Sequence, residues 1–311
     1  MKELVLSNGI AQFFIIVLLT VFACAKVTIQ GRACRKYVRN TQDSVLYNTL
    51  FFASVAITLC VMFPMAAPEK STVLLAAVSS IANVAFQVLY SVSLTMGPVS
   101  LTVLIVNFSV LIPTAMSFFA FGEKMYYTQL LGIAFLIVSM ILSVNKTEGE
   151  QKASKKWLIF TLIALVCTGT SSSIQKLFYK TEASKTANSD ITLLVLIYVF
   201  STILALAVYI FKAGTGKKEK STFWFSKNVL FYAVGVGVLI AVFQKLFMFC
   251  SENIDGSFMF PTYTGLQSVS MSIIGIILFK DNLSVRQKLG VACGVFSIAA
   301  MNLKIGGFFT V

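Results

Sequence analysis

Eight polar side chains interrupt long apolar runs of the sequence and could together bind a small polar molecule. They are Asn83, Gln87, Tyr90, Asn107, Gln244, Lys245, Tyr263 and Gln267. The first three are spaced i, i+4, i+7 and the last two i, i+4, so each group shares one face of a helix. Amides and phenols offer directional hydrogen bonds, and the set therefore predicts a polar cavity. A single buried amide can also simply bridge two helices, which stays the alternative for each residue alone.

The ionisable side chains limit the chemistry that such a cavity could perform. The chain has no histidine, and no Asp or Glu falls inside an apolar run as we delimit the runs below. A nucleophile activated by a general base cannot be assembled from these residues. The six cysteines form no CxxC pair, so neither a disulfide framework nor a metal site is expected. We expect a protein that is not an enzyme and carries no cofactor.

Three lysines lie inside or near the ends of apolar runs: Lys26, Lys176 and Lys245. A lysine at the centre of a membrane helix costs roughly 2.5–3.5 kcal/mol. Snorkelling of the ammonium to the membrane surface explains Lys26, which lies near the end of its run. For Lys245 both snorkelling and substrate binding stay open. If Lys245 binds substrate, the substrate carries an anionic group, as an amino acid or a small organic acid does.

The overall composition places these residues in a membrane. Hydrophobic residues make up 57% of the 311 residues and charged residues only 12%, against about 25% charged in a soluble domain. Runs near the roughly 20 residues that span a bilayer cover 9–29, 45–65, 73–95, 98–121, 127–144, 157–179, 191–211, 229–250, 257–279 and 285–303. The sequence predicts an all-α polytopic membrane protein with ten transmembrane helices. The lipid bilayer is its expected partner, and nucleic acid is not.

Basic residues are distributed unevenly between the connections. Sixteen of the 25 Lys and Arg residues fall in odd-numbered connections, against six in even-numbered connections and the termini. Since cytoplasmic loops carry the excess of Lys and Arg, this predicts odd connections in the cytoplasm and both termini outside. A multi-pass protein of the cell membrane, most simply the cytoplasmic membrane of a bacterium, is expected.

An internal repeat relates the two halves. Residues 121–133 (FGEKMYYTQLLGI) match residues 279–291 (FKDNLSVRQKLGV) at an offset of 158. Two weaker matches pair Phe86-Gln87 with Phe243-Gln244 and Thr28-Ile29-Gln30 with Ser173-Ile174-Gln175. We predict a five-plus-five division into 1–144 and 157–311, joined by a basic connecting loop at 145–156. Because five is odd, the second half is inverted, and inverted repeats are typical of secondary transporters with a central binding site.

The repeat motifs also carry a family resemblance. The motif residues are Gly97-Pro98, Pro113, Phe121-Gly122-Glu123, Gln129 and Gly132 in the first half and Phe279-Lys280-Asp281, Gln287 and Gly290 in the second. The chain resembles the EamA-like branch of the drug/metabolite transporter superfamily. The resemblance implies a ten-helix inverted-repeat fold and movement of small metabolites, often export of amino acids or related compounds. The Trp-Gly pair that is frequent near the first helix of the family is absent here.

The expected function is therefore transport of a small molecule. We expect a secondary transporter that exports a carboxylate-bearing metabolite by alternating access. A multidrug transporter and a sugar- or nucleoside-type transporter are alternatives, as are a non-transporting membrane scaffold and a lipid scramblase. The coupling ion and the oligomeric state stay open.

Overall fold

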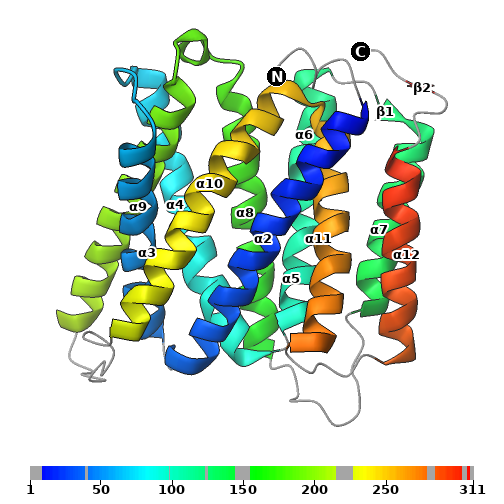
Figure 1. The fold of residues 1–311 in the computed structure, drawn as a ribbon, viewed down its shortest axis with the longest axis horizontal. Helices are drawn as coiled ribbons and strands as arrows, with labels where there is room; N and C mark the ends of the chain where they lie inside the picture. The colour runs from blue at the N-terminus through cyan, green and yellow to red at the C-terminus, as the bar shows by residue number, and fades with distance from the viewer. Residues whose placement is uncertain are drawn as a thin grey trace.

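The chain forms a bundle of upright helices packed side by side (Figure 1). The computed structural model describes residues 9–38, 41–97, 99–122, 125–143, 155–214, 227–278, 284–302 and 307–308. The helices are α2 (Gly9–Tyr37), α3 (Thr41–Met62), α4 (Lys70–Met96), α5 (Val99–Asn107), η1 (Phe108–Val110), α6 (Leu111–Phe121), α7 (Tyr127–Ser143), α8 (Lys155–Phe178), η2 (Glu182–Lys185), α9 (Ser189–Gly214), α10 (Lys227–Asn253), α11 (Gly256–Leu278) and α12 (Val285–Asn302). Two-residue strands, β1 (Met125–Tyr126) and β2 (Gly307–Phe308), pair antiparallel.

The described helices have the length and composition of membrane-embedded segments. Six of them, α2, α3, α4, α8, α9 and α10, are long and apolar enough to cross a membrane, and shorter apolar stretches cover Ile105–Ala120, Tyr127–Ser139 and Lys288–Ser297. Large apolar side chains also face outward, with Val61 and Phe119 each 80% exposed. Water would disfavour such a surface and lipid would not. The chain is an all-α protein built for a membrane.

The helix bounds agree with the predicted runs at nearly every end. Apart from the end of α2, each bound lies within four residues of its prediction. The helix α2 continues to Tyr37, beyond the predicted residue 29, and its last turn holds Arg35 and Lys36. Cations at a helix C-terminus offset the partial negative charge there, so the helix extends into what we predicted as a loop.

The fourth predicted run is divided into two helices by a tight turn. The 3₁₀ segment η1 lies between α5 and α6, and Pro113 follows it as the third residue of α6. Proline has no N–H, so residue 113 cannot donate to the carbonyl of Ser109. That carbonyl faces Gly169 of α8, where an added Cβ would lie 2.9 Å from the oxygen. The break is therefore covered by protein, as irregular backbone in a membrane must be. The helix α11, in contrast, continues through Pro261.

Two reciprocal hydrogen bonds join α7 and α12, which stand side by side at one end of the bundle (Figure 1). Ser139 on α7 donates to the carbonyl of Gly290 on α12 at 2.6 Å. Ser297 on α12 donates to the carbonyl of Gly132 on α7 at 2.7 Å. From one bond to the other the residue number increases on α7 as it decreases on α12, so the two helices run antiparallel. The glycines permit the close approach that each bond requires.

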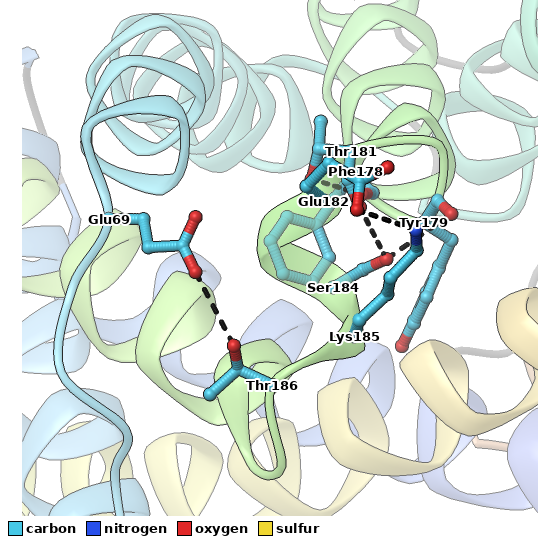
Figure 2. Close-up of polar contacts among 8 residues, drawn as sticks. All are labelled: Glu69, Phe178, Tyr179, Thr181, Glu182, Ser184, Lys185 and Thr186. Atoms are coloured by element: carbon cyan, nitrogen blue, oxygen red, sulfur yellow. Dashed lines mark hydrogen bonds and ion pairs between the residues drawn. The ribbon is translucent and has the colours of Figure 1, made fainter.

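The connection between α8 and α9 is folded tightly onto itself and onto a neighbouring connection (Figure 2). The hydroxyl of Ser184 in η2 donates to the carbonyl of Thr181, the residue just before η2, at 2.8 Å. Thr186 donates to the carboxylate of Glu69 at 3.4 Å, and the backbone of Ala66 exchanges two bonds with the hydroxyl of Thr192. These contacts join the α3–α4 connection to the start of α9 at the end of the bundle where α2 begins.

We predict that the two serine–glycine bonds stabilise the bundle equally and independently. Ser139→Ala and Ser297→Ala should each lower the free energy of unfolding by about 0.6 kcal/mol, the average for such bonds in membrane proteins. Successive bonds are seven residues, or about 10 Å, apart along each helix, so the double variant should show the sum of the two losses.

Denaturant titration of the purified chain in bicelles measures these losses. Thr170→Ala is the matched control, because the hydroxyl of Thr170 donates to Val166 on its own helix. A control loss as large as that of the two variants would contradict a specific role for the α7–α12 bonds.

Candidate functional site

A central cavity of about 140 Å³ lies midway along the helices. Seven of the eight predicted site residues line it: Asn83, Gln87, Tyr90, Asn107, Gln244, Tyr263 and Gln267. They come from α4, α5, α10 and α11, and Asn83 and Ile240 lie near the middle of α4 and α10. The structure therefore brings together side chains that are up to 184 positions apart in the sequence.

The amides of the cavity wall also bind neighbouring helices. Gln87 accepts a bond from Gln30 of α2 at 3.2 Å. Asn107 donates to the hydroxyl of Ser268 on α11 at 2.8 Å. At these positions each amide therefore both bridges two helices and lines the cavity.

Two further amides connect the cavity wall to α9. Asn83 donates to the hydroxyl of Ser201 at 3.2 Å, and Gln244 donates to the hydroxyl of Tyr198 at 2.9 Å. Each bond fixes the direction of the amide and leaves its other polar atom available. The wall is thus polar and held in place before any ligand arrives.

Polar residues of α8, none of which we predicted as a site residue, form a further part of the wall. They are Thr168, Ser171, Ser172 and Gln175. Their spacing of i, i+3, i+4 and i+7 puts them on one face of α8. That spacing was readable in the sequence, but small hydroxyl residues are common in membrane helices and did not stand out.

Lys26 of α2 lines the cavity and is its one charged side chain among the described lining residues. Its side chain is 9% exposed, and the ammonium lies 5.7 Å from the ring centre of Phe86 and 5.8 Å from that of Tyr90. Our snorkelling interpretation of Lys26 is wrong, because the side chain is buried and lines the cavity, whereas snorkelling would carry the ammonium to the membrane surface.

Lys245 does not line the cavity. Its ammonium forms an ion pair with Asp190 of α9, with 2.5 Å between Nζ and Oδ2. The two side chains are 33% and 18% exposed. We expected Lys245 to have no carboxylate partner and therefore to be available to an anionic substrate. This expectation is wrong, because Lys245 already pairs with the carboxylate of Asp190.

Two carboxylates lie inside helices that begin earlier in the sequence than we predicted. The helix α9 begins at Ser189 and includes Asp190, and α3 begins at Thr41 and includes Asp43. Both occupy the first helical turn, where a carboxylate offsets the positive end of the helix dipole. The prediction that no Asp or Glu lies inside a helical run is therefore wrong at these two positions, and it is also wrong at Glu252, which lies in the last turn of α10.

Tyr179 lies just beyond the end of α8, near the Lys245–Asp190 pair. Its hydroxyl donates to the carbonyl of Met248 at 3.1 Å. Burial and then the nearby charge of Asp190 raise the pKa of Tyr179 well above its ordinary value. The phenol therefore stays protonated and keeps its bond to α10, so this end of α10 is attached to both α8 and α9.

Aromatic rings provide the apolar part of the cavity wall. Phe243 and Phe247 of α10 lie 6.0 and 6.4 Å from Tyr263 of α11, measured between ring centres. Phe260 packs against Phe247 at 6.0 Å. The cavity can therefore receive a ligand that has both an apolar body and polar groups.

Other sequence expectations fall outside this region. Gly132 and Gly290 of the repeat motif serve the α7–α12 contact. Glu123 and Asp281 of the same motif lie outside the described residues. Within the described part of the chain, no three histidine, cysteine or carboxylate side chains are grouped as metal ligands.

Comparisons with known proteins show a shared fold. No family model matches the chain, and no curated protein matches it. A solved structure described as "Crystal structure of protein" superposes with a TM-score of 0.62 at 12% identity. The match covers 92% of this chain and 98% of that chain. At this identity the similarity concerns the fold alone.

We predict that Lys245 and Asp190 stabilise the protein as a pair. Lys245→Met and Asp190→Asn should each lower the unfolding free energy, because each leaves the opposite charge without its partner. The double variant should recover part of the loss, with a coupling of at least about 0.5 kcal/mol.

Unfolding in detergent micelles measures that coupling as a double-mutant cycle. The matched control is the exposed Lys185–Glu182 pair, whose side chains are 72% and 84% exposed. Its coupling should be smaller, since solvent screens an exposed pair. Additive losses for Lys245 and Asp190 would contradict the role of the pair.

Proposed function

We propose that this chain is a secondary transporter that moves a small polar metabolite across the membrane by alternating access. The observation that carries the proposal is the central cavity, which is polar, partly aromatic and lined by helices from both halves of the chain. A binding site midway between two halves is the usual arrangement in such transporters.

We further propose the five-plus-five inverted repeat, with halves 1–144 and 157–311. The α7–α12 bonds support it, because Ser139 and Ser297, like Gly132 and Gly290, are related by the offset of 158 found in the sequence. A two-fold axis that exchanges the halves would turn one of these bonds into the other.

Helix packing also supports the inverted repeat. The helix α2 packs on α10, and α4 packs on α8. The helix α3 packs on α10, and α4 packs on α9. The first three helices are α2, α3 and α4 in one half and α8, α9 and α10 in the other. If the halves are exchanged, the α2–α10 contact becomes the α4–α8 contact, and the α3–α10 contact becomes the α4–α9 contact. Two similar units that pack symmetrically can interchange conformations, which would expose one site alternately to the two sides.

The substrate in this proposal is a carboxylate-bearing metabolite, and the direction is export from a bacterial cell. Lys26 within the cavity supports an anionic substrate, and the EamA-like motif residues support metabolite export. The charge distribution of the connections supports termini on the outer side. Multidrug or sugar-type transport, a scaffold and a scramblase are the competing functions that the following experiment separates.

We predict that proteoliposomes containing only this chain accumulate at least one compound from a defined mixture of organic acids, amino acids, sugars, nucleosides and amines. Mass spectrometry of the vesicle contents, compared with protein-free vesicles, measures the accumulation. Ser172→Trp should abolish it, because Ser172 lines the cavity and the indole would fill the space.

The matched control is Val166→Trp, at a position on the same helix that is 53% exposed on the outer surface. It should transport as the unmodified chain does. Absence of accumulation, or full activity of Ser172→Trp, would overturn transport through this cavity. Loss of lipid asymmetry in the same vesicles would instead identify a scramblase.

A further inference from the structure

The ammonium of Lys26 is held inside the cavity by its surroundings. The side chain comes from the middle of α2 and is 9% exposed. The rings of Phe86 and Tyr90 flank the ammonium on α4. Aromatic faces attract a cation but do not neutralise it.

The described residues provide Lys26 with no carboxylate partner, since among them no Asp or Glu lines the cavity. Asp190 is occupied by Lys245. A buried cation without a counter-charge is costly in a medium of low dielectric. A bound anion would supply the counter-charge that Lys26 lacks among the described lining residues.

We infer that Lys26 binds the anionic group of the substrate, and that the substrate is an organic acid with no ammonium group. This inference rests on the transport function proposed above. It assigns binding of the substrate's anionic group to Lys26 in place of Lys245. It also narrows the expected substrates from amino acids and organic acids to organic acids that have no ammonium group.

An amino acid fits this cavity less well than a simple acid does. Its carboxylate would pair with Lys26, but its ammonium would find no carboxylate to neutralise it among the described lining residues. The described lining residues offer amides, hydroxyls and rings instead. Bringing a second cation near Lys26 is repulsive, and the repulsion is strong when water is excluded.

The remaining wall suits the rest of an acid. Gln175 of α8 and Asn107 of α5 can bind hydroxyl or carbonyl oxygens, because amides both donate and accept. Phe243 and Phe247 of α10 can pack on an aliphatic or aromatic body. The wall therefore offers a cationic group, polar side chains and apolar rings in one cavity.

The test uses the full chain in proteoliposomes with the defined metabolite mixture, and the accumulated compounds are sorted by net charge at pH 7. The unmodified chain should accumulate compounds that are negative and lack an ammonium group. Lys26→Met should lower their initial rate at least tenfold, and Lys26→Arg should retain measurable transport because the positive charge remains.

Lys185→Met is the matched control, because Lys185 is an exposed lysine outside the cavity, and it should transport normally. A competition assay on the unmodified chain needs no variant to fold. Benzoate should reduce uptake of the accumulated acid, while benzylamine, which has the same ring and the opposite charge, should not.

The outcomes separate this inference from the proposed function. Accumulation of zwitterions, neutral compounds or amines alone would keep the transporter and overturn the assignment to Lys26. Full transport by a folded Lys26→Met variant, or competition by benzylamine as strong as that by benzoate, would also overturn it. Absence of transport of any compound would overturn the proposed function itself.

Discussion

The rest of the structure depends on one constraint: backbone N–H and C=O groups inside a membrane find no water and must be satisfied within the chain. Long helices such as α2 and α10 meet this constraint throughout their length. The exception is η1, which divides the fourth helical run where Pro113 removes a donor. The exception is tolerated because Gly169 of α8 lies directly against the carbonyl of Ser109. Irregular backbone therefore occurs beside the cavity, where protein covers it.

Lipid tails are as apolar as leucine, so helices in a membrane need something other than the hydrophobic effect to fix their neighbours. Here small residues and polar bridges supply it. At Gly237 of α10 an added Cβ would collide with the side chain of Ser54 on α3, so the lack of a side chain at residue 237 permits the close approach of these helices. Asn107 and Ser268 connect α5 to α11. The same polar side chains that align the helices also form the wall of the cavity, so the bundle and the site are specified together.

The sequence predicts the helices well because apolar length is a local property, and it predicts seven cavity residues because their polarity conflicts with their surroundings. It fails where the answer depends on the ends of helices. Placing the end of α2 too early made Lys26 look like a surface lysine. Placing the start of α9 too late hid Asp190 and made Lys245 look unpaired. An error of two residues at the start of α9, or of eight at the end of α2, changes which charges lie inside a helix, and apolar composition alone does not define those ends.

Charged side chains within the helices lie in three different environments. Arg35 and Lys36 lie in the last turn of α2, where the helix dipole favours them. Lys245 lies within α10, and Asp190 neutralises it. Lys26 has neither advantage: it lies mid-helix, and its described neighbours in the cavity are rings and amides. A mid-helix charge of this kind destabilises the empty protein by several kcal/mol relative to an apolar residue. A ligand of opposite charge offsets that destabilisation only while it is bound, and this difference between empty and occupied states is what a binding site requires.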